Sequence, residues 1–217
     1  MKKLLLIPAL ALLSFQAALA DWVVVQKVVT DGAESTMTLK AKGDKSRMDI
    51  GDKMSLMLDT ASGDTSMFMH EQKMMMKISP ESLKAMMAMA AQSLGGEPAA
   101  KPVATDKTEK VGENECTIYT WSGKIGNGKF WVAKDFPDAK ALNELQDKMM
   151  KAIGNPMASI VPQNSDFPGM VVKSEMEVMG KKSVSELVSA KQEPVTDDTF
   201  KAPEGYQEMK MPALPGK

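Results

Sequence analysis

Closely spaced turn signals divide the first third of the chain, so only short extended segments can form between them. Asp-Gly or Gly-Asp pairs occur at four positions: 31–32, 43–44, 51–52 and 63–64. Such pairs favour tight reversals between strands. The segment WVVVQKVVT is rich in β-branched residues, and STMTLKAKG alternates Met37, Leu39 and Ala41 with polar residues. Residues 22–78 therefore predict successive antiparallel hairpins.

Two later segments have the period of an amphipathic helix. The first begins at Ser79-Pro80, places Leu83 and Met87 on one face, and ends at Gly95-Gly96. The second begins at Pro137 and carries four apolar side chains at helical spacing: Leu142, Leu145, Met149 and Ile153. Strand patterns return after each helix. The expected fold class is α+β, with about ten antiparallel strands and two helices on one side of the sheet.

The chain is expected to contain one folded domain between an N-terminal leader and a C-terminal tail. We expect the domain to span residues 21–209, because this length fits a single hydrophobic core. Residues 96–113 are rich in Pro, Ala, Lys and Glu, which predicts an exposed flexible loop. Residues 210–217 are expected to be a disordered tail. No repeat of 20 to 50 residues is visible, which argues against a propeller or solenoid.

The first twenty residues have the order of a secretory signal peptide. Lys2 and Lys3 precede the apolar run 4–15, and Ala18-Leu19-Ala20 supplies the small residues of a cleavage site. A run of about a dozen residues is shorter than the roughly 20 that span a bilayer as a helix. We expect cleavage after Ala20, no transmembrane segment, and a soluble periplasmic protein that is a monomer.

The charge balance and the scarce reactive residues disfavour several functions. Without Lys2 and Lys3, the count of basic residues falls from 27 to 25 against 28 acidic ones, so no nucleic-acid partner is expected. His70 is the only histidine, and no serine lies in a Gly-x-Ser-x-Gly turn. Cys116, the only cysteine, is expected to be a small core residue. We therefore predict no catalytic residues and no cofactor.

Methionine is the unusual component, with 21 residues, five of them in the stretch MFMHEQKMMMKI at 67–78. Methionine can simply fill a core, and its flexible thioether also suits a cavity for ligands of varied shape. Thioether sulfur also binds Cu(I), which leaves a soft-metal site as a further alternative. The residues of that alternative are Met67, Met69, His70, Met74 and Met76.

Several short motifs resemble a known family. They are GDKMSLMLDTASG with the following MFMHEQKMMMKI, CTIYTW with FWVAKDF, and the ending TFKAPEGYQEM. Together they resemble the bacterial exported family of unknown function numbered 4412, which is similar in fold to lipoprotein carriers of the LolA, LolB and LppX type. The resemblance implies a strongly curved antiparallel half-barrel with two helices over its concave face. It also implies an apolar cavity, which takes up acyl chains in the carriers.

Three functional hypotheses follow. In the first, a non-catalytic protein holds a lipid or another apolar small molecule in a cavity lined by eight residues: Met54, Leu56, Met67, Met69, Met74, Met76, Leu83 and Met87. In the second, the interior is filled and the domain docks another envelope protein. The third is the Cu(I) site described above. Trp22 and Trp121 are expected to be exposed, where they could contact either kind of partner.

Overall fold

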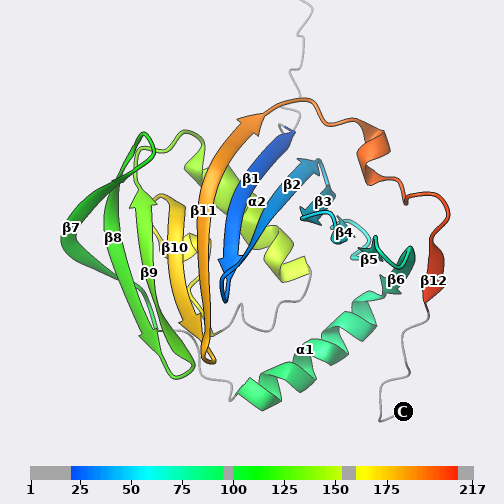
Figure 1. The fold of residues 1–217 in the computed structure, drawn as a ribbon, viewed down its shortest axis with the longest axis horizontal. Coiled ribbons are helices and arrows are strands. Elements are labelled where there is room, and N and C mark those ends of the chain that lie inside the picture. The colour runs from blue at the N-terminus through cyan, green and yellow to red at the C-terminus, as the bar shows by residue number, and fades with distance from the viewer. Residues whose placement is uncertain (1–20, 95–99, 153–159, 210–217) are drawn as a thin grey trace, which may run out of the picture.

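The computed structural model describes residues 21–94, 100–152 and 160–209, which form one open, curved sheet and two helices (Figure 1). The order of strands across the sheet is β12-β6-β5-β4-β3-β2-β1-β11-β10-β9-β8-β7. The strands are β1 Trp22–Thr30, β2 Ala33–Lys42, β3 Lys45–Ile50, β4 Met54–Asp59, β5 Thr65–Met69, β6 Met74–Ile78, β7 Val103–Val111, β8 Asn114–Gly123, β9 Gly126–Ala133, β10 Met170–Val178, β11 Lys181–Gln192 and β12 Gln207–Met209. The helices are α1 Pro80–Leu94 and α2 Ala139–Ala152.

The hairpins predicted from the turn signals are confirmed. Each strand from β1 to β6 pairs antiparallel with the next, with continuous register. Asp31 and Gly32 both have positive φ, 50° and 85°, as a two-residue turn between twisted strands requires. The pairing of β1 with β11 then joins this half of the sheet to the half formed by β7–β11.

The sheet differs from the expected one in two of its strands. Residues 103–111, within the predicted loop, form β7, whose many charged and exposed side chains suit the edge of a sheet. The short β12 pairs parallel to β6, so the sheet is mixed and has twelve strands. The proposed signal peptide and residues 210–217 lie outside the described residues.

The prediction that Trp22 and Trp121 are exposed is wrong. Their side chains are only 7% and 3% exposed. Trp22 lies on the same face of β1 as Val24 and packs with Val24 and Leu39 in the main core cluster. Single tryptophans near strand ends give no pattern from which burial can be deduced.

The amphipathic helix predicted after Pro137 is α2, which packs against the middle of the sheet. Leu142 and Met149 are 0% and 3% exposed and belong to the same core cluster as Val24 and Leu39. Ile153 lies outside the described residues. Helix α1 follows β6 and lies at a distance from α2, beyond the ends of β1 and β2 (Figure 1). Among the helices in the described ranges, none is long and apolar enough to span a bilayer.

The segment after α2 is held to the sheet by a second apolar cluster. Phe167 lies edge-on to Tyr119, with ring centroids 5.6 Å apart, and 4.9 Å from the ring of Phe130. Trp121 and Val132 complete the buried part of this cluster. The segment 160–169 is therefore anchored against β8 and β9, while its Asn164 faces α2.

A polar network fastens the C-terminal segment to the face of the sheet that lies opposite α2. Ser55, which is fully buried, donates to Asp49 at 2.6 Å and lies 2.7 Å from Nε2 of His70. Arg47 donates from Nε to Asp49 at 2.7 Å and from Nη1 to the carbonyl of Thr199 at 3.2 Å. The remaining nitrogen of the histidine ring, Nδ1, lies 2.5 Å from the Tyr206 hydroxyl.

This network makes the stability of the fold depend on pH. Burial alone raises the pKa of Asp49, but hydrogen bonds from Ser55 and Arg47, and the charges of Arg47 and Lys40, hold it below the ordinary carboxyl value. A carboxyl group with a lowered pKa in the folded state contributes stability above the pKa of the unfolded chain, about 3.9. That contribution is lost as the pH falls through the folded value.

The matching variant is Asp49→Asn, which keeps the shape of the side chain and removes its charge. We expect the difference in free energy of unfolding between wild type and variant to be constant near neutral pH and to shrink from about pH 4 downward. Urea unfolding at a series of pH values measures this difference. Because all other carboxyl groups are shared, a difference that stays constant down to pH 2 would contradict the assigned role of Asp49.

Candidate functional site

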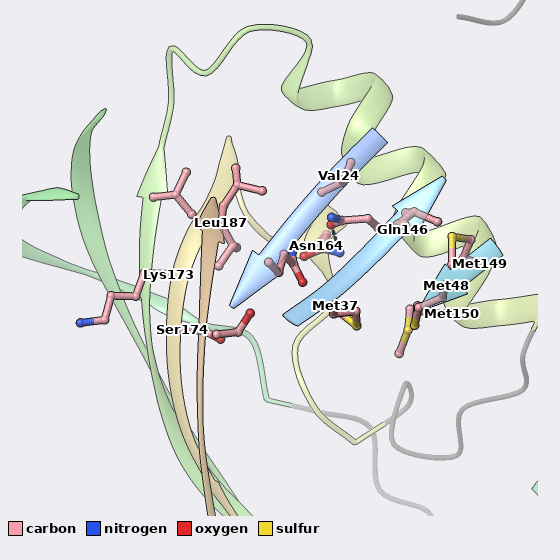
Figure 2. Close-up of a pocket in the computed structure, with 15 residues that line it drawn as sticks. Val24, Met37, Met48, Gln146, Met149, Met150, Asn164, Lys173, Ser174 and Leu187 are labelled. Atoms are coloured by element: carbon pink, nitrogen blue, oxygen red, sulfur yellow. Dashed lines mark hydrogen bonds between the residues drawn. The ribbon is translucent and has the colours of Figure 1, made fainter. Parts of the chain in front are cut away.

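An apolar cavity lies between α2 and the sheet strands on both sides of β1 (Figure 2). Its volume is about 210 Å³. The side chains that line it come from β1, β2, β3, β10 and β11, from α2, and from the segment after α2. The apolar ones are Val24, Met37, Leu39, Met48, Met149, Met150, Val171, Val172 and Leu187.

Strand register determines which side chains form the floor of the cavity. Directly opposite residues of an antiparallel pair point to the same face. Val24 is opposite Leu39, which is opposite Met48, and Gln26 lies between Met37 and Leu187. The alternating apolar positions of β2 and β3 thus form one continuous floor.

Helix α2 supplies the opposite wall. Gln146, Met149 and Met150 are three and four residues apart, so they project from one side of the helix. Met149 packs into the core at 3% exposure, whereas Met150 is half-buried at the edge of the cavity. Met48, Met149 and Met150 gather at one end of the cavity (Figure 2).

Most of the remaining lining residues are polar and uncharged. Gln26, Gln146, Asn164, Ser174 and Ser185 contribute amides and hydroxyls. Asn164 donates from Nδ2 to Oε1 of Gln146 at 2.8 Å, which joins the segment after α2 to the helix. Lys173 is the only charged residue of the described lining, and its side chain points away from the cavity (Figure 2).

Six of the eight residues predicted to line a cavity lie together on β4, β5 and β6. Met69 is opposite both Met54 and Met74, and Met67 is opposite both Leu56 and Met76. All six are half-buried, and we name this surface the methionine face: Met54, Leu56, Met67, Met69, Met74 and Met76. Leu83 is half-buried on α1, and the side chain of Met87 lies outside the described residues.

The methionine face adjoins the apolar cavity and is distinct from its lining. Leu56 is directly opposite Met48, so the face begins where the floor of the cavity ends. The seven predicted residues whose side chains the structure describes all lie outside the cavity lining. The lining contains Met37, Met48, Met149 and Met150, which were not predicted to line a cavity. The alternation around Met37 and the helical position of Met149 were the available signals.

The structure separates His70 from the methionines of the soft-metal hypothesis. Met67 with Met76 and Met69 with Met74 form two opposite pairs on the methionine face. Both ring nitrogens of His70 contact hydroxyl groups, those of Ser55 and Tyr206. Ser55 lies between Met54 and Leu56 in β4, so its side chain points to the other face of the sheet. Within the described ranges, histidine, cysteine and acidic residues form no group of three that could hold a metal ion.

The residue types of a catalytic triad occur together in Ser55, His70 and Asp49, but the order of their hydrogen bonds is different. In a triad the histidine lies between the serine and the acid and takes the proton of an accessible serine. Here the buried Ser55 lies between His70 and Asp49, and Nη2 of Arg47 also donates to it at 3.2 Å. This geometry stabilises the fold and does not expose a nucleophile.

Comparison with known proteins identifies one family. The sequence model of the domain of unknown function DUF4412 matches residues 23–206. No curated protein matches the chain.

Three solved structures show distant likeness in fold. PNGF-II in its C2 space group is 15% identical, with a TM-score of 0.43 over 89% of this chain and 31% of its own, so this chain spans about a third of its length. Mycobacterium tuberculosis lipoprotein LppX is 12% identical, with a TM-score of 0.42 over 80% of this chain and 88% of its own. A DUF1329 family protein from Desulfovibrio piger is 11% identical, with a TM-score of 0.37 over 86% and 91%. Likeness at this level carries no argument about function.

Proposed function

The chain belongs to the DUF4412 family, and we propose that it is an exported, non-catalytic protein that binds an apolar ligand, such as a lipid acyl chain, between α2 and the sheet. The observation that supports this proposal is the apolar cavity, with methionines on both of its walls. Met37 and Met48 come from the sheet, and Met149 and Met150 come from the helix. Unbranched thioether side chains adapt to flexible ligands better than branched ones.

The size of the cavity shapes the proposal. Its 210 Å³ lies below the roughly 300–1,000 Å³ typical of small-molecule sites. We infer that the cavity holds one part of the ligand and that the rest of the chain runs along the methionine face. The two surfaces meet at Met48 and Leu56. In this arrangement the curved sheet works as a half-barrel around an extended apolar chain.

Export and the absence of catalysis are parts of the same proposal. The order of residues in 1–20 supports secretion to the periplasm. The cavity lining in the described residues includes neither histidine, cysteine nor a carboxylate, the groups that most often act in acid-base or nucleophilic catalysis. The described lining therefore supports ligand binding, which needs no acid, base or nucleophile, better than it supports catalysis.

The test is native mass spectrometry of the protein purified from the periplasm, followed by solvent extraction and metal analysis of the same sample. A bound mass that extracts as lipid supports the proposal. Copper bound at one equivalent, and lost in a variant lacking Met67, Met69, Met74 and Met76, would instead assign a soft-metal role to the methionine face. A protein that is empty and also binds no added apolar probe would refute ligand binding and favour a domain that docks another envelope protein.

Two neighbouring residues of β11 provide a matched pair of variants. Leu187 lines the cavity, whereas Val188 is 63% exposed. We expect Leu187→Asp to weaken binding of the fluorescent probe N-phenyl-1-naphthylamine by at least about tenfold, because an unpaired charge in an apolar site is costly. Val188→Asp introduces the same charge and is expected to bind like wild type. Fluorescence titration measures both affinities, and circular dichroism checks that both variants are folded. Equal affinity of the two variants would place the probe elsewhere.

A further inference from the structure

The polar groups of the apolar cavity define the kind of head group that its ligand can carry. This inference rests on the proposed function. The hydrogen bond from Asn164 to Gln146 fixes how both amides are oriented. The Gln146 oxygen is occupied, so its NH₂ group is the free donor, and Oδ1 of Asn164 is the free acceptor. Ser174 and Ser185 add hydroxyls from directly opposite positions on β10 and β11.

These groups have unused hydrogen-bonding capacity. Within the described part of the chain, the amide of Gln26 and the hydroxyls of Ser174 and Ser185 make no side-chain hydrogen bond, and Gln146 and Asn164 make only the one between them. None of these atoms is among the buried unpaired ones, so the unpaired groups of these lining residues keep some exposure to solvent. A ligand that donates and accepts hydrogen bonds can satisfy them.

The cavity offers no charge to pair with an ionised head group. Lys173 points away from it (Figure 2). The ammonium group of this lysine lies 3.0 Å from Glu175 and 4.4 Å from the centroid of the Trp131 ring, so it is already engaged outside the cavity. A carboxylate or phosphate bound here would lose hydration without gaining a counter-charge, which is unfavourable.

We propose that the cavity selects single-chain amphiphiles with an uncharged head group that both donates and accepts hydrogen bonds, such as a hydroxyl or amide. The head lies among Gln146, Asn164, Ser174 and Ser185. The hydrocarbon chain extends past Met48 and Met149 toward the methionine face. Carboxylate and phosphate amphiphiles with the same chain bind more weakly.

The test uses four ligands with the same twelve-carbon chain: dodecanol, monolaurin, laurate and dodecyl phosphate. Each is added to the mature protein below its critical micelle concentration or, for dodecanol, below its solubility limit, and displacement of N-phenyl-1-naphthylamine gives its affinity at pH 7.5. We expect dodecanol and monolaurin to bind at least about tenfold more tightly than laurate and dodecyl phosphate. Laurate is expected to gain affinity as the pH falls and its carboxyl group becomes protonated.

A charge introduced at the head-group end tests the position. Ser185→Lys is expected to reverse the preference, so that laurate binds more tightly than dodecanol. Ser189→Lys is the matched control, because Ser189 of β11 pairs with Val25 of β1 and does not line the cavity. Gln146→Leu is the second variant, should Ser185→Lys not fold. It is expected to lower the affinity for monolaurin relative to the affinity for the dye, because only the head group loses a hydrogen-bond partner.

The outcomes separate this inference from the proposed function. Laurate or phosphate binding as tightly as the neutral ligands would overturn the head-group selectivity and leave apolar binding intact. A failure of all four ligands and of the dye to bind would overturn both. Neutral ligands that bind more tightly, with a preference unchanged in Ser185→Lys and in Gln146→Leu, would refute the position of the head group.

Discussion

Phe68→Ala is expected to lower the free energy of unfolding by about 3–5 kcal/mol, the usual cost of truncating a fully buried aromatic side chain. Phe68 is 1% exposed on β5, directly opposite Ser55 and Met75. Its ring is edge-on to Tyr206, with centroids 5.8 Å apart. The alanine leaves a cavity and also removes a contact that holds the C-terminal segment. Because a domain is stable by roughly 5–15 kcal/mol in total, this loss is large.

Urea unfolding of wild type and Phe68→Ala measures the difference. Val103→Ala is the control, because Val103 is 65% exposed on the edge strand β7 and its truncation is expected to change stability by less than about 0.5 kcal/mol. A loss below about 1 kcal/mol in Phe68→Ala would show that the packing around β5 and Tyr206 is not as described.

Leu142→Ala on α2 is expected to cost about 2–5 kcal/mol and to weaken probe binding as well. Leu142 is completely buried and packs in the main core cluster together with Met149 of the same helix. Since α2 also carries Met149 and Met150 into the apolar cavity, a helix that packs less firmly presents a less defined wall. Stability and affinity should therefore fall together in this variant.

Lys140→Ala is the control on the same helix. The side chain of Lys140 is 90% exposed and lies 3.9 Å from Glu144, an exposed ion pair worth about 0.5 kcal/mol or less. Urea unfolding and titration with N-phenyl-1-naphthylamine are performed on both variants. If Leu142→Ala binds the dye as wild type does while losing stability, α2 anchors the fold without forming the ligand site.

Strand register explains how far the site residues could be predicted. The turns predicted which residues meet across the hairpins, but Met54, Leu56 and Met67 lie in segments with apolar residues on both faces, so the sequence did not decide which face points inward. That Met48 meets Leu56 follows from the same local rules. Which end of this long apolar floor α2 covers was not predictable, because it depends on how a helix more than eighty residues away packs.

The sequence by itself determined the local structure and the family. Turn residues, alternation and helical spacing predicted the hairpins from β1 to β6 and both helices, since these depend on interactions between residues close in the chain. The short motifs also indicated the DUF4412 family, which the match over residues 23–206 confirms. The methionine content suggested an adaptable apolar surface but gave no location for a cavity.

The tertiary structure alone decided the arrangement of these elements. It placed β1 between β2 and β11, made β12 parallel to β6, and brought Met37 and Leu187 to either side of Gln26. Pairings between residues about 150 positions apart depend on which complete faces fit and bury one another. Residue patterns describe each face but not its partner. The apolar cavity arises from such long-range contacts, so only the folded chain shows it.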